Sequence, residues 1–155
     1  MMPLPGKTRI IAALFLLWIG GGALTAAHAQ QAEDLGPYRV HYSAINTSQL
    51  SPEVARTFGI QRSTNRALLN LAVLRRHEGG MDEPARARIA VEAVNIAGQR
   101  RAVEMREVTE QEAIYYIGTF RIHNEERITF QIQVQPEDPA EPAREFRFQQ
   151  QFYVY

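Results

Sequence analysis

A short polar segment between two apolar stretches carries the side chains best suited to chemistry. The segment is Arg62-Ser63-Thr64-Asn65-Arg66, and its two guanidinium groups could hold a carboxylate or phosphate through paired hydrogen bonds. Serine and asparagine are also common turn residues, and an arginine can lie along an apolar edge while its charged end stays in water. Two interpretations therefore stand: an ordinary turn, or a recognition patch completed by His41 and Asn70. The candidate binding residues are His41, Arg62, Ser63, Asn65, Arg66, Asn70 and Tyr115.

The histidines and carboxylates do not form a recognisable metal or catalytic motif. His41, His77 and His123 lie on separate segments, without the close spacing of paired metal ligands. No Gly-x-Ser-x-Gly turn presents a serine nucleophile, and the chain has no cysteine for thiol catalysis, thiolate metal sites or disulfides. We therefore predict no catalytic residue, no cofactor and no metal site. A hydrolase centred on His41 remains the weakest alternative.

A second candidate surface comes from aromatic and apolar residues that fall opposite the predicted core positions of their strands. These residues are Tyr115, Ile117, Tyr153 and Tyr155. Exposed tyrosine and isoleucine can mark a contact surface between proteins. The alternative is that these strands are buried on both faces, and the alternation alone does not decide between the two.

The first 29 residues have the organisation of a secretory signal peptide. Lys7 and Arg9 precede an apolar run over residues 10–24, and the small residues Ala27 and Ala29 follow. Cleavage after Ala29 would leave Gln30 as the first residue. No cysteine follows for lipid attachment, and no second apolar run would keep the product in a membrane. We expect an exported protein without membrane insertion after the signal is removed.

The remaining 126 residues are enough for one domain. They carry 15 arginines, no lysine and 17 acidic residues, a net charge of −2. This balance lacks the basic patch typical of nucleic-acid binding, so we predict no nucleic-acid partner. The predicted organisation is a signal peptide over residues 1–29, a flexible segment over 30–36 and a single domain over 37–155.

From Tyr38 onward, apolar and polar residues alternate with a period of two, which indicates β-strands. Glycine-bearing or polar turns separate the runs. Seven strands are expected, near residues 38–44, 67–74, 88–93, 102–108, 114–122, 128–135 and 146–154. Seven short antiparallel strands in this length favour an all-β, immunoglobulin-like sandwich.

One short helix interrupts this pattern. Ser51 is a suitable N-cap, Pro52 fits the first helical position, and Gly59 fits the position just past the end. Leu50, Val54 and Phe58 recur at four-residue spacing and give the helix an apolar side. We expect that side to close an open end of the sandwich.

Several segments together resemble a known protein family. They are residues 41–46 (HYSAIN), 51–55 (SPEVA), 59–63 (GIQRS), 67–70 (ALLN), 95–98 (NIAG), 113–116 (AIYY) and 148–153 (FQQQFY). In order and spacing they are similar to the proteobacterial domain-of-unknown-function family 4426, over essentially the whole chain after the signal peptide. The resemblance implies an exported all-β protein in the Gram-negative periplasm and carries no assigned activity.

These observations favour a non-catalytic binding module. With no catalytic constellation and an architecture that presents edges and loops, we expect a periplasmic protein that acts on another envelope protein. The alternative is a small-molecule or anion binder that uses Arg62 and Arg66.

Overall fold

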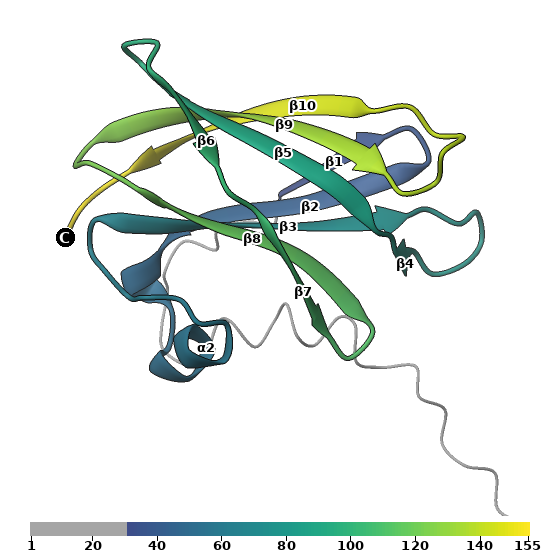
Figure 1. Cartoon of the computed structure of the whole chain (residues 1–155), viewed down its shortest axis with the longest axis horizontal. Helices are drawn as coiled ribbons and strands as arrows, with labels where there is room; N and C mark the ends of the chain where they lie inside the picture. The colour runs from purple at the N-terminus through teal and green to yellow at the C-terminus, as the bar shows by residue number, and fades with distance from the viewer. Residues whose placement is uncertain (1–30) are drawn as a thin grey trace, which may run out of the picture.

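The computed structural model describes residues 31–155. The predicted signal peptide and its cleavage site, Ala27, Ala29 and Gln30, lie outside the described residues. Ten strands within residues 31–155 form two antiparallel sheets that pack face to face (Figure 1).

Sheet A has six strands in the order β1-β2-β3-β8-β7, with β4 paired to β3. Their bounds are β1 (Gln31–Leu35), β2 (Tyr38–Asn46), β3 (Arg66–Arg75), β4 (Glu83–Pro84), β7 (Arg106–Glu110) and β8 (Ala113–Arg121). Sheet B has four strands in the order β10-β9-β5-β6. Their bounds are β5 (Ala87–Asn95), β6 (Arg100–Val103), β9 (Glu126–Pro136) and β10 (Arg144–Phe152).

The β-sandwich prediction is confirmed, with differences in strand number. The expected strand at residues 102–108 is two strands, because the chain leaves sheet B after Val103 and enters sheet A at Arg106. Gly118 lies beneath this crossing, where an added Cβ would be 2.6 Å from the Glu104 carbonyl oxygen. The short strands β1 and β4 make up the remaining difference. The segment 30–36 was expected to be flexible, and residues 31–35 instead pair with β2.

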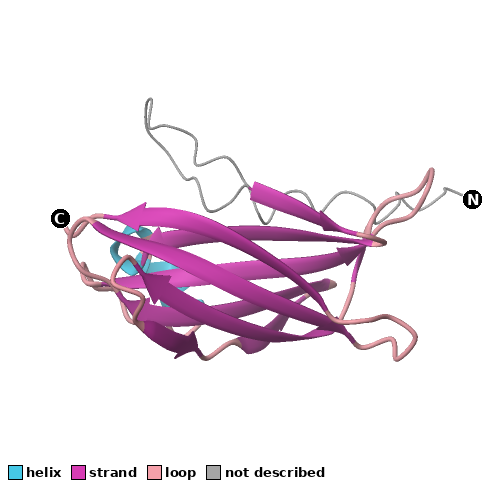
Figure 2. Ribbon diagram, turned by 90° about the horizontal axis from the view of Figure 1, so that it is seen from above, coloured by secondary structure: helices cyan, strands magenta, loops and turns pink. Residues whose placement is uncertain are grey.

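The core lies between the sheets and consists of the inward-facing residues of the alternating strands. Figure 2 shows the long strands running side by side along the length of the molecule. Phe130 is fully buried, and its ring centroid lies 5.3 Å from that of Phe120 and 4.8 Å from that of Phe148. Buried aromatic and aliphatic side chains together supply the hydrophobic stabilisation of a domain that has no disulfides.

A buried tyrosine fixes the start of β5 against β8. The Tyr116 hydroxyl accepts a hydrogen bond from the Ala87 backbone N–H at 2.8 Å and donates one to Glu107 at 3.4 Å. The Tyr116 ring belongs to the core between the sheets. The hydroxyl therefore ties a strand of sheet B to sheet A.

Replacing Tyr116 with phenylalanine should lower the free energy of unfolding by about 1 kcal/mol, since the ring stays and only the hydroxyl is lost. Urea denaturation of the two proteins measures this difference. A Tyr116→Phe variant as stable as the parent would show that the hydroxyl bonds contribute no net stability.

The helix α2 (Pro52–Thr57) follows a short 3₁₀ turn, η1 (Thr47–Gln49). The Ser51 hydroxyl accepts a hydrogen bond from the Val54 N–H at 3.2 Å, and Gly59 has a positive φ of 63°. Both confirm the helix boundaries predicted from the sequence.

The predicted location of α2 is wrong. The helix does not close an end of the sandwich but packs on the outer face of sheet A (Figure 1). Leu50, Ala55 and Ile60 form a second apolar cluster with Leu68 of β3 and Ile117 of β8. Those two residues point away from the main core because side chains alternate along a strand. The apolar side of the helix and the outward apolar residues of sheet A therefore bury one another.

Candidate functional site

Beyond the part covered by α2, the outer face of sheet A carries a mixed apolar and polar surface, which we call the shelf. Its residues are His41, Ser43, Asn70, Ala72, Leu74 and Tyr115. Ser43 lies opposite Asn70 across the β2–β3 ladder, and His41 lies opposite Ala72. Directly opposed residues project to the same face of a sheet. The shelf therefore adjoins the helix-covered cluster, and Tyr115, which packs against that cluster, lies at the border between them.

Asn70 is the unusual member of the shelf. It lies on the central strand β3 and is only 8% exposed, yet its Oδ1 atom has no hydrogen-bond partner within the described residues. A buried amide oxygen without a donor is uncommon and costs free energy relative to one that is paired. Because this oxygen is itself buried, a molecule outside the fold could supply a donor to it only after the Asn70 side chain rotates outward. Asn70 is therefore the shelf residue whose side-chain hydrogen bonding the described part of the fold leaves incomplete.

The other polar groups of the shelf are uncharged near neutral pH. Burial, reinforced by the nearby Arg39 charge, lowers the pKa of His41, so its imidazole is neutral there. Burial raises the pKa of Tyr115, so its phenol stays protonated. Ala72 is 7% exposed and contributes no bulk. The shelf thus offers hydrogen-bonding groups among apolar side chains, a combination suited to an uncharged contact.

The segment Arg62 to Arg66 uses its polar groups within the chain. The Arg62 guanidinium donates to the Ser48 carbonyl at 2.9 Å, and the Arg66 guanidinium donates to the Thr119 hydroxyl at 2.8 Å. The buried Thr47 hydroxyl accepts from the Ser63 N–H at 2.9 Å. These contacts connect η1 to the start of β3.

Asn65 completes this local network by accepting a hydrogen bond from the Ser63 hydroxyl at 2.6 Å. Arg66 shares the outer face of β3 with Asn70, but Leu68 lies between them beneath α2. The seven residues predicted from sequence therefore separate into two groups. His41 and Asn70 lie on the shelf, and Tyr115 packs against the helix-covered cluster at the border of the shelf, while the Arg62–Arg66 segment lies on the other side of that cluster.

Three shelf residues were not predicted from the sequence: Ser43, Ala72 and Leu74. The alternation of β2 and β3 contained the necessary signal, because residues two apart on a strand point to the same face. Residues 41 and 43 are related in this way on β2, and residues 70, 72 and 74 on β3. Of the predicted aromatic surface, Ile117 is buried in the second cluster. Tyr153 and Tyr155 are 41% and 88% exposed and stack on one another, with ring centroids 6.0 Å apart.

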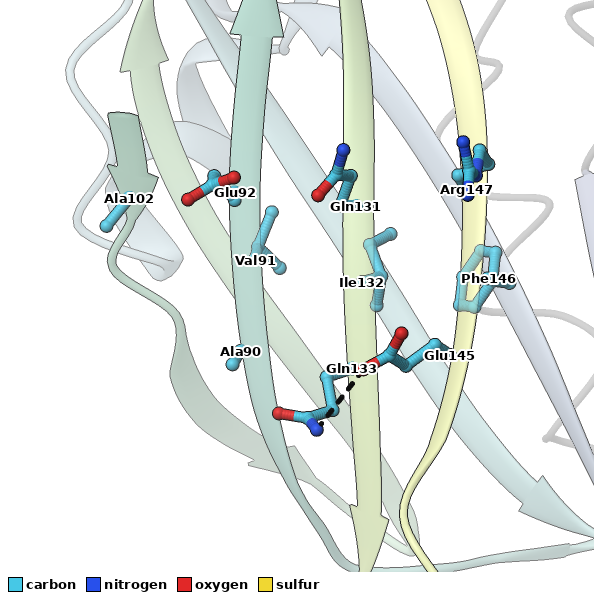
Figure 3. A pocket seen from close by; sticks show the side chains of 10 residues that line it. All are labelled: Ala90, Val91, Glu92, Ala102, Gln131, Ile132, Gln133, Glu145, Phe146 and Arg147. Atoms are coloured by element: carbon cyan, nitrogen blue, oxygen red, sulfur yellow. Dashed lines mark hydrogen bonds between the residues drawn. The ribbon is translucent and has the colours of Figure 1, made fainter. Parts of the chain in front are cut away.

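The outer face of sheet B carries a second surface feature, a shallow hollow of about 610 Å³ (Figure 3). Polar side chains from β5, β9 and β10 surround it, and Ala90 and Ala102 contribute little bulk. Within residues 31–155, no group of three histidine, aspartate or glutamate side chains is placed to hold a metal ion. No helix in that part of the chain is long and apolar enough to cross a membrane.

Charged side chains form a network where β1 turns into β2. The Asp34 carboxylate lies 2.7 Å from the Arg39 guanidinium and 3.4 Å from that of Arg76. The hydrogen bond from Arg39, aided by the charges of Arg39 and Arg76, lowers the pKa of Asp34. The ionised form is therefore favoured in the folded protein.

The Asp34 network predicts a loss of stability in acid. The unfolded carboxyl has a pKa of about 3.9, and the folded one lies below it. The ionised Asp34 carboxylate therefore stabilises the fold fully above pH ~4. This stabilisation is lost as the pH falls through the lower pKa of the folded state, where the unfolded state binds up to about one more proton than the folded state. As the pH is lowered from 6 to 2, the urea midpoint should fall more steeply for the parent than for Asp34→Asn. Parallel curves would contradict this assignment.

Comparison with known proteins identifies a family and a related fold. The family model for the domain of unknown function DUF4426 matches residues 32–155. The crystal structure of a DUF4426 family protein from Pseudomonas aeruginosa PAO1 is similar, with a TM-score of 0.70 and 28% sequence identity. The match covers 84% of this chain and 99% of that one. No curated protein matches the chain.

Proposed function

The chain belongs to the DUF4426 family, a family without an assigned function, and from its structure we propose that it is a non-catalytic binding module. In this proposal the protein is exported to the periplasm and uses the shelf to bind another envelope protein. The N-terminal sequence, with its charged start, apolar run and small residues before Gln30, supports the export step.

The single observation that carries the proposal is the buried, unpaired Oδ1 of Asn70. In this proposal the Asn70 side chain rotates outward on binding, and the partner supplies an N–H or O–H group to its oxygen while covering Leu74. Removing apolar surface from water and completing a buried hydrogen bond both favour association. The shelf side chains are themselves uncharged near neutral pH, and the Arg39–Asp34 ion pair lies at their edge, because Arg39 is directly opposite Leu74.

The alternative of an anion site at Arg62 and Arg66 receives less support. Both guanidinium groups already donate to oxygen atoms of this chain, and these bonds would have to be exchanged for bonds to a ligand. The geometry gives these residues a structural role between η1, β3 and β8.

The test is a crosslinked pull-down of the tagged protein from intact cell envelopes, analysed by mass spectrometry. Ser43→Arg places a long charged side chain on the shelf and should abolish enrichment of the partner. Gln149→Arg makes a comparable change at an exposed position of sheet B and should leave enrichment unchanged. Thermal melting of both variants verifies that they fold.

Two outcomes would overturn the proposal. One is equal recovery of the partner by the parent, Ser43→Arg and Gln149→Arg, which would show that the shelf makes no contact. The other is recovery of no protein above a matched exported control.

A further inference from the structure

One end of the sandwich carries most of the exposed large hydrophobic side chains. At this end β2, β5, β8 and β10 finish and β3, β6 and β9 begin, and residues 153–155 lie there (Figure 1). Ile96, Tyr153 and Tyr155 project from it and are 85%, 41% and 88% exposed. Among residues 31–155 the other exposed side chain of this kind is Met81, at the opposite end. Exposed hydrophobic side chains gathered at one end of a fold are typical of a contact surface.

Ile96 stands in an ordered turn between β5 and β6. The Asn95 Oδ1 atom accepts hydrogen bonds from the N–H groups of Ala97 and Gln99 at 3.0 and 2.9 Å, and Gly98 provides the positive φ of 78° that the turn needs. These contacts hold the turn in one conformation. The turn therefore presents the Ile96 side chain to solvent instead of folding it back onto the sheets.

The C-terminal segment is likewise fixed to the sandwich. The Asn46 side-chain amide donates to the Tyr153 carbonyl oxygen at 2.6 Å, and the Val154 N–H donates to the Asn124 Oδ1 atom at 3.0 Å. The Val154 side chain packs against the core. Chain termini are usually poorly ordered unless contacts tie them down. Here the contacts hold Tyr153 and Tyr155 outward as a stacked pair.

The same end is positively charged, although the chain as a whole is not. Three segments meet there, residues 62–66, 95–101 and 121–127, and together they carry six arginines and two glutamates, a net side-chain charge of +4. The rest of residues 31–155 carries nine arginines and fifteen acidic residues, a net side-chain charge of −6. An anionic surface would therefore attract this end and repel the remainder of the molecule.

Four of the six arginines keep an uncompensated charge. Arg62, Arg66, Arg121 and Arg127 form no ion pair with a carboxylate within the described residues. Arg66 and Arg121 lie directly opposite one another on β3 and β8, an arrangement in which like charges repel. The hydrogen bonds of Arg62 and Arg66 go to uncharged oxygen atoms and leave the charge intact. Attraction to a charged surface acts at a distance, so it leaves these bonds in place.

We infer that this end docks on a phospholipid surface that contains anionic headgroups. A tyrosine has an apolar ring and a hydroxyl that stays in water, which suits the boundary between headgroups and acyl chains. Arginines beside the inserted side chains attract the lipid phosphates. The contact is peripheral, because only side chains at the end of the sandwich reach the headgroups. It is separate from the shelf and does not depend on the proposed function.

The test is co-sedimentation of the purified protein, without its signal peptide, with phospholipid vesicles. We expect binding to vesicles of phosphatidylglycerol and phosphatidylethanolamine, weaker binding as salt is added, and no binding to phosphatidylcholine alone. Ile96→Ser should weaken binding about tenfold, because it removes inserted apolar surface. Arg121→Gln should weaken it about fivefold, the effect of one basic residue near an anionic surface.

The opposite end supplies matched controls. Met81→Ser removes an exposed hydrophobic side chain there, and Arg88→Gln removes an exposed arginine near the start of β5. Both variants should bind vesicles as the parent does. Equal losses in Ile96→Ser and Met81→Ser, or in Arg121→Gln and Arg88→Gln, would overturn the inference.

Tyr155→Trp reports on contact with lipid, since the single tryptophan of the sequence, Trp18, lies in the predicted signal peptide. The fluorescence emission of Tyr155→Trp should move to shorter wavelength when anionic vesicles are added, and that of Met81→Trp should not. Unshifted emission from Tyr155→Trp would overturn the inference. So would binding of a polyglutamate peptide as tight as that of the vesicles, which would indicate an acidic protein as the partner.

Discussion

Replacing Phe130 with alanine is expected to lower the free energy of unfolding by about 3–5 kcal/mol. The side chain is fully buried, and its ring packs against those of Phe120, Phe148 and Phe152. Alanine would leave a cavity between two sheets that cannot close around it without moving whole strands. The loss is measured by the decrease in the urea midpoint, with the slope of unfolding free energy against urea concentration unchanged.

Tyr153→Ala is the control for this prediction, because Tyr153 is 41% exposed. It should change the free energy of unfolding by about 0.5 kcal/mol or less. If Phe130→Ala lowered the free energy of unfolding no more than Tyr153→Ala does, the aromatic cluster would not be the centre of the core.

Asn70→Leu should raise the free energy of unfolding by about 1–3 kcal/mol and reduce capture of the partner. Leucine has nearly the shape of asparagine and removes a buried amide oxygen that has no donor in residues 31–155. The same change removes the acceptor that we assign to the partner. A substitution that stabilises the fold while weakening binding separates a functional role from a structural one.

Asn46→Leu is the matched control, since the Asn46 side-chain amide already donates to the Tyr153 carbonyl oxygen. The Asn46→Leu variant should have a lower free energy of unfolding and should still capture the partner. If Asn70→Leu also lost stability, the amide of Asn70 would be needed by the fold and could not serve as evidence for a binding surface.

The sequence predicted the sandwich because its strands alternate strongly and its turns contain glycine or polar residues. It also predicted the helix, whose Ser51 cap and Gly59 end are local features. It did not predict β1 and β4, which are short and pair only with one neighbour each. Nor did it predict that the expected strand over residues 102–108 divides at Glu104. The chain changes sheet there, and the crossing needs the space that Gly118 of β8 leaves beneath it.

The shelf was predicted only in part, for a similar reason. His41, Asn70 and Tyr115 were each recognised by type, but the strand order that places them on one face is a property of the sheet. The location of α2 decided which residues remain on the shelf, since the helix covers Leu68 and Ile117. An apolar pattern on both faces of β3 indicates burial on both sides, and the sequence alone does not specify what provides the cover.

The shelf is the proposed contact surface, and site-specific photocrosslinking tests that proposal most directly. A photoreactive amino acid at position 74 on the shelf, or at position 149 on sheet B, would be activated in intact cells. We predict one dominant crosslinked envelope protein from position 74 and none from position 149. Crosslinking of the same protein from position 149 alone, or no specific product from position 74, would contradict the account.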